Sequence, residues 1–62
     1  METIRILVCD DESSIVDAIA IYLEQEGYTV IKAYNGQEAL NALNEYKVHL
    51  VIMDIMMPML NG

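Results

Sequence analysis

The sequence has 62 residues, of which 55% are hydrophobic, and its ten acidic and three basic side chains give a formal net charge of −7 at pH 7. A chain of this length forms one small domain at most. The acidity argues against direct contact with nucleic acid or an anionic membrane, and neither a membrane span nor a signal peptide is evident.

The first predicted element is a strand over residues 4–9 (IRILVC), because a short apolar run rich in Val and Ile is typical of a strand buried on both faces. It contains the only cysteine, Cys9, which we interpret as a small buried hydrophobe. An unpaired thiol fits a reducing compartment, so we expect a cytoplasmic protein. The strand runs directly into Asp10, Asp11 and Glu12.

A helix is predicted over residues 14–26. Ser14 with Asp17 three positions later has the spacing of a capping box, and Gly27 supplies a left-handed stop. Apolar residues at helical spacing are expected to face the core, with Asp17 facing away: Ile15, Ala18, Ile19, Tyr22 and Leu23.

A second strand is predicted over residues 28–34 (YTVIKAY), and Lys32 suggests that it lies near a sheet edge. Asn35 with Glu38 forms a second capping-box pattern, which opens a predicted helix over residues 36–46. A third strand follows over residues 48–54, ending in Asp54. The expected inner face of the second helix consists of Ala39, Leu40, Leu43 and Tyr46.

This order, β-α-β-α-β, predicts an α/β fold: half of a doubly wound, flavodoxin-like parallel sheet with strand order 2-1-3. The first and third strands are then neighbours, and their carboxyl ends bring Asp10, Asp11 and Asp54 to one edge. Clustered carboxylates repel one another unless a cation lies among them, so we predict a site for a hard metal ion that prefers oxygen ligands.

The segments ILVCDDE, GYTVIKAYNGQEAL and LVIMDIMMPMLNG, in this order and at this spacing, resemble the N-terminal part of a response-regulator receiver domain of two-component signalling. The resemblance spans essentially the whole chain but only about half of the family's domain, so residues 1–62 are expected to be an incomplete receiver domain. It is nearest to regulators with a winged-helix DNA-binding output domain. DNA contact is therefore expected only through an output domain of a parent protein.

The resemblance implies a role for four residues. Asp54 matches the phosphoacceptor, which takes a phosphoryl group from a histidine kinase in the presence of Mg²⁺. Asp11 matches the acid that ligates Mg²⁺ directly, Asp10 the acid that acts through water, and Met56 the residue whose backbone carbonyl is the third protein ligand. A module of this kind is a signalling protein and not an enzyme.

Two parts of the family's domain have no counterpart here. These are a Ser or Thr after the fourth strand and a Lys after the fifth, which contact the phosphoryl group and respond to it. Lys32 and Lys47 lie on the wrong elements to replace that lysine. We therefore expect that the 62-residue chain can accept a phosphoryl group but cannot convert it into an output.

Three alternatives remain open. An aspartate-nucleophile phosphatase also places an acid after an apolar strand, but it needs a second acid two residues later, where this chain has Met56. A second alternative is a structural half-domain fragment that associates with itself and has no signalling activity. In either case the chain is predicted to form a homodimer, through the bare edge of its third strand or an uncovered apolar face. Residues 10–12 could simply begin a helix, and Glu12 in particular is expected to cap or be solvated and not to bind metal.

Overall fold

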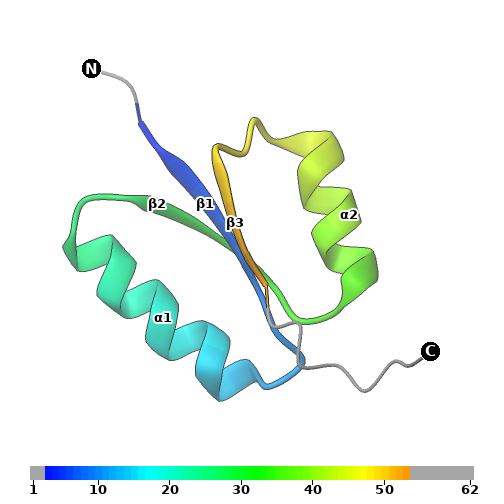
Figure 1. Ribbon diagram of the computed structural model, residues 1–62, viewed down its shortest axis with the longest axis horizontal. Coiled ribbons are helices and arrows are strands. Elements are labelled where there is room, and N and C mark those ends of the chain that lie inside the picture. The colour runs from blue at the N-terminus through cyan, green and yellow to red at the C-terminus, as the bar shows by residue number, and fades with distance from the viewer. Residues whose placement is uncertain (1–2, 54–62) are drawn as a thin grey trace.

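The computed structural model describes residues 3–53, which form β1 (Arg5–Cys9), α1 (Ser13–Gln25), β2 (Thr29–Ala33), α2 (Gly36–Glu45) and β3 (Leu50–Met53) (Figure 1). The strands are all parallel and lie in the order β2-β1-β3. The predicted partial doubly wound α/β fold with strand order 2-1-3 is therefore confirmed, with element ends shifted by one or two residues. Neither helix is long and apolar enough to cross a membrane, within the part of the chain that the structure describes.

The central strand β1 is buried on both faces, as its apolar run predicts. The two helices lie on opposite sides of the sheet (Figure 1). Successive side chains of a strand point to opposite faces, so Ile6 and Val8 pack with Val16 of α1, whereas Leu7 and Cys9 join the cluster on the α2 side. Each face of β1 thus has its own small core.

The predicted inner face of α1 is partly wrong. The buried residues are Val16 and Ala20, with Ile19 and Leu23 partly buried beside them, whereas Ile15, Ala18 and Tyr22 are exposed. The helix carries apolar residues around most of its circumference, so apolar spacing alone does not determine which stripe faces the sheet.

The inner face of α2 also differs from the prediction. It consists of Ala39 and Ala42, which pack with Ala33, while Leu40, Leu43 and Tyr46 are each about half exposed or more. Alanine lets a helix approach a sheet closely, and the larger side chains then lie outside the contact with β1 and β2.

The start of α2 confirms the second predicted capping box. The Asn35 side chain accepts a hydrogen bond from the Glu38 backbone N–H at 2.9 Å, and Glu38 Oε1 accepts one from the Tyr34 backbone N–H at 2.8 Å. The returning bond therefore reaches the residue before the N-cap instead of the N-cap itself. Together the two bonds join the end of β2 to the first turn of α2.

The capping box predicted at Ser14 and Asp17 is wrong. The helix begins at Ser13 with Glu12 as its N-cap, whose side chain makes no capping bond, so Ser14 is already inside the first turn. Asp17 does not simply face solvent. Its Oδ1 accepts a hydrogen bond from the Tyr34 hydroxyl at 3.0 Å and lies 3.4 Å from Lys32 Nζ. These partners follow from packing α1 against β2, which local sequence spacing does not reveal.

The end of α1 forms a Schellman motif around Gly27, as predicted for its stop. The Gly27 N–H donates to the Glu24 carbonyl at 3.0 Å, and the Tyr28 N–H donates to the Leu23 carbonyl at 3.2 Å. Gly27 has φ +96°, a left-handed conformation that side chains disfavour. The motif turns the chain directly into β2.

Replacing Gly27 with alanine is expected to lower the free energy of unfolding by about 1 kcal/mol, because the new Cβ strains the left-handed backbone. No atom lies within 4 Å of the added Cβ, so the loss comes from the backbone alone. Chemical denaturation measures it. Gly36→Ala is the matched control, since that site is equally open but helical, and it should be neutral or stabilising. An equal loss in both variants would contradict this explanation.

Candidate functional site

The carboxyl ends of β1 and β3 lie side by side. In the parallel register Cys9 is paired with Met53, the last residue of each strand. Asp10, Asp11 and Glu12 follow Cys9 in the chain and thus leave the sheet at this edge. Open parallel sheets bind their ligands outside the carboxyl ends of the strands. This edge is therefore the candidate functional site.

Asp10 is held firmly at this edge. It is only 8% exposed and is the one buried charged side chain among residues 3–53. Its Oδ1 accepts a hydrogen bond from the Glu12 N–H at 2.9 Å, and its own N–H donates to the Ala33 carbonyl at 3.2 Å. A buried carboxylate is costly without such partners. The contacts fix Asp10 where β1, β2 and the start of α1 meet.

Asp11 and Glu12 are exposed, but they have different surroundings. The Glu12 carbonyl accepts hydrogen bonds from the N–H groups of Ile15 and Val16, so Glu12 begins α1 through its backbone. Its side chain makes no capping bond and is exposed, which agrees with the solvated alternative. The Asp11 carboxylate makes no hydrogen bond or ion pair with another residue of the 3–53 segment. The carboxylates of Asp11 and Glu12 are thus both open to an ion from solvent at this edge.

Asp54 and Met56, the other two predicted site residues, lie outside the described residues. Within residues 3–53, no three Asp, Glu, His or Cys side chains are close enough to hold a metal ion. What the structure brings to this edge is one fixed carboxylate, Asp10, and two exposed ones, Asp11 and Glu12. Such a set suits Mg²⁺, which binds oxygen ligands and keeps several of its waters.

Beside Asp10 there is an apolar hollow of about 380 Å³ between α1 and the end of the sheet. Asp10 is the one charged residue among those that line it; the others are Val8, Cys9, Ile15, Ile19, Ile52 and Met53. The carboxylate edge therefore adjoins a hydrophobic surface along the α1 side of β3.

Cys9, directly before the acidic residues, has a shielded thiol. Burial raises the pKa of Cys9, and the nearby carboxylates of Asp10, Glu38 and Asp11 raise it further. Its Sγ lies 3.6 Å from the Asn35 carbonyl, to which it donates. The interpretation of Cys9 as a buried hydrophobe is confirmed, and the thiol is unsuited to act as a nucleophile at neutral pH.

Alkylation of Cys9 is accordingly expected to be slow in the folded protein, with a pH profile displaced upward relative to the urea-unfolded chain. The fold favours the neutral thiol, so its contribution to stability is present below the pKa of the unfolded thiol and is lost as pH rises through the folded pKa. Rates measured with iodoacetamide across pH would test this. Coincident profiles for the folded and unfolded chain would contradict it.

Comparison with known proteins identifies the family. The profile of the response regulator receiver domain matches residues 6–62, a span that includes Asp10, Asp11 and Asp54. The chain is 46% identical to "Response regulator GtcR" of Aneurinibacillus migulanus, covering 92% of this chain and 24% of that protein. It is 47% identical to "Alkaline phosphatase synthesis transcriptional regulatory protein PhoP" of Bacillus subtilis (strain 168), covering 94% of this chain and 24% of that protein.

A third relative is of another kind. The chain is 48% identical to "CAI-1 autoinducer sensor kinase/phosphatase CqsS" of Vibrio cholerae, covering 94% of this chain and 8% of that protein. The chain thus spans about a quarter of the two regulators, and far less of the kinase. No solved structure matches it. From the family match over nearly its whole length and the strand order of its fold, the chain belongs to the response regulator receiver domain family.

Proposed function

We propose that this protein is a phosphoacceptor module, which takes a phosphoryl group from a histidine kinase onto Asp54 with the help of Mg²⁺. Receiver domains of response regulators are signalling modules that interact with histidine kinases. The observation that carries the proposal is the register of β1 and β3. Cys9 is paired with Met53, and the next residues in the sequence are Asp10 and Asp54.

The proposed reaction needs a carboxylate nucleophile. Asp54 attacks the phosphorus of a phosphohistidine, so that an O–P bond forms as the N–P bond breaks and the imidazole leaves with the electron pair. The product is an acyl phosphate on Asp54. The protein's part is to align the attacking oxygen with the leaving nitrogen and to offset the charge on the phosphoryl oxygens.

The Mg²⁺ ion, when bound, would supply the charge neutralisation at the phosphoryl oxygens. Asp11 is proposed as a direct ligand on the family resemblance, and its exposed carboxylate, which makes no hydrogen bond or ion pair within residues 3–53, is free to take that role. Asp10 is proposed to act through water, since one of its oxygens is already engaged by the Glu12 N–H. The backbone carbonyl of Met56 is proposed as a further ligand, on the family resemblance alone.

The proposal is tested by offering the protein a small phosphodonor, such as acetyl phosphate, with and without Mg²⁺. We expect the intact mass to rise by one phosphoryl group when Mg²⁺ is present and not when it is chelated. Peptide mapping should place the group on Asp54. A phosphoryl group on another residue, or transfer that ignores chelation, would refute the proposal.

We also propose that the chain associates with a second copy of itself through β3. On the side away from β1, β3 has no neighbouring strand among residues 3–53. Its Leu50, Val51 and Met53 side chains are 52%, 41% and 45% exposed. A bare apolar edge is a template for pairing. Light scattering on a sizing column should give a dimer mass at micromolar concentration, and a compact monomer would contradict this proposal.

A further inference from the structure

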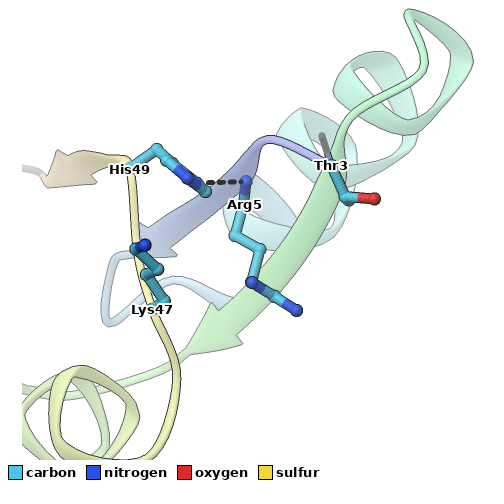
Figure 2. Close-up of a pocket in the computed structure, with 4 residues that line it drawn as sticks. All are labelled: Thr3, Arg5, Lys47 and His49. Carbon is cyan, nitrogen blue, oxygen red and sulfur yellow. Dashed lines mark hydrogen bonds between the residues drawn. The ribbon is translucent and has the colours of Figure 1, made fainter. Parts of the chain in front are cut away.

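The amino end of the sheet, opposite the acidic edge, holds a basic pocket. We use this name for the hollow of about 230 Å³ lined by Thr3, Arg5, Lys47 and His49 (Figure 2). The whole chain has only four residues of the Lys, Arg and His types, and three of them line this pocket. The chain as a whole is strongly acidic, with a net charge of −7, so a pocket lined by three of its four basic side chains differs from the rest of its surface.

His49 is tied to Arg5 by two hydrogen bonds. The Arg5 backbone N–H donates to His49 Nδ1 at 3.0 Å, and the His49 backbone N–H donates to the Arg5 carbonyl at 2.9 Å (Figure 2 shows the first). The imidazole thus takes the place of a backbone acceptor and adds a rung to the β1–β3 ladder. Because Nδ1 is the acceptor, the ring proton lies on Nε2, which makes Nε2 a hydrogen-bond donor.

The basic pocket is therefore rich in donors. Among residues 3–53, those that line it include no carboxylate. The ion pair found within residues 3–53 joins Lys32 to Asp17, so it engages neither Arg5 nor Lys47. Guanidinium, ammonium, hydroxyl and imidazole N–H groups each donate hydrogen bonds to the oxygens of a phosphate group.

We propose that the basic pocket binds a small oxyanion of the phosphate class. Its volume lies below the roughly 300–1,000 Å³ of pockets that enclose drug-sized ligands, so the bound group is a phosphate or a small phosphate monoester. Lys47 and Arg5 supply charge, and His49, held by its bond to Arg5, supplies an oriented donor. The site lies at the other end of the strands from Asp10 and Asp11, and it does not depend on the proposed phosphorylation of Asp54.

The test is a titration of the isotopically labelled protein with inorganic phosphate, followed by NMR without Mg²⁺ and at constant ionic strength. We expect saturable shifts at the amides of Arg5, Lys47 and His49, and none at Asp10 or Asp11. A parallel titration with glycerol phosphate separates the two sources of the group. Tighter binding of the ester assigns the pocket to an organic phosphate, and tighter binding of the free ion assigns it to inorganic phosphate.

Lys47→Gln should weaken binding about tenfold, the effect of losing one charge-assisted hydrogen bond, and Lys47→Arg should retain it. Lys47 is exposed and lies between α2 and β3, so neither change threatens the fold. Lys32→Gln, which removes the lysine outside the pocket, is the matched control and should leave the affinity unchanged. Shifts that never saturate, or an equal weakening by Lys32→Gln, would show only general ion screening and overturn the proposal.

Discussion

Replacing Asp54 with asparagine is expected to abolish phosphorylation of the protein, both by acetyl phosphate and by a histidine kinase. An amide oxygen is a far weaker nucleophile than a carboxylate, so no acyl phosphate forms at this position. The change also removes one of the charges that would hold Mg²⁺ beside Asp11. Nearly all of the transfer rate is therefore lost, which is the largest functional effect that we expect from any single substitution.

The measurement is the rate of phosphoryl incorporation, followed by intact mass with saturating Mg²⁺. Glu24→Gln is a suitable control, because Glu24 is an exposed carboxylate near the end of α1, away from the acidic edge. It changes the net charge equally and should leave the rate unaltered. Residual incorporation in Asp54→Asn at the wild-type rate would remove Asp54 from its proposed role.

Replacing Leu7 with alanine is expected to lower the free energy of unfolding by about 2–5 kcal/mol. Leu7 is fully buried at the centre of β1, in the core on the α2 side. The neighbours that would have to close the cavity are mostly small, namely Cys9, Ala33, Ala39 and Ala42. A domain of this length has a total stability of only about 3–9 kcal/mol, so this one change should leave the chain largely unfolded or close to it.

Urea denaturation followed by circular dichroism would measure the loss. Leu40→Ala is the matched control, because Leu40 is 57% exposed on α2 and alanine has the higher helix propensity. It should be nearly neutral. If the two leucine substitutions had similar effects, the core would not be centred on β1 as described.

The sequence predicts the elements and their order well because each has a local signal. The apolar run before Asp10 predicts a strand buried on both faces. Gly27 marks the end of α1 through its left-handed backbone, and Asn35 marks the start of α2 through its capping side chain. Parallel connection through helices then leaves few possible strand orders. The strand order 2-1-3 follows from that restriction and is confirmed.

The inward faces of the helices are predicted less well, because they depend on how closely each helix approaches the sheet. In α1, Val16 is buried, whereas the more hydrophobic Ile15 is exposed. In α2 the small residue Ala42 is buried and Leu43 is not. Hydrophobicity ranks these pairs wrongly, since the contact is decided by shape across the interface and not by the apolar character of one residue.

The acidic edge could be predicted from the sequence, whereas the basic pocket could not, again because one depends on a local signal and the other on tertiary packing. Asp10 and Asp11 follow directly from a strand signal, so their place at the carboxyl end of β1 is readable from the sequence. The bond from the Arg5 N–H to His49 Nδ1 joins residues 44 positions apart and exists only once β1 and β3 are in register. The available signal was the concentration of Arg5, Lys47 and His49 near the starts of adjacent strands in a chain with few other basic groups.

The central claim is that the carboxylates after β1 and after β3 form a single Mg²⁺ site. It is tested most directly by measuring Mg²⁺ affinity calorimetrically in the wild type, Asp11→Asn, Asp54→Asn and the double variant. We predict that each single change weakens binding strongly and that the double variant loses less than the sum, with a coupling of about 0.5–3 kcal/mol. Additive losses, or unchanged affinity in both single variants, would show that the two carboxylates do not share one ion.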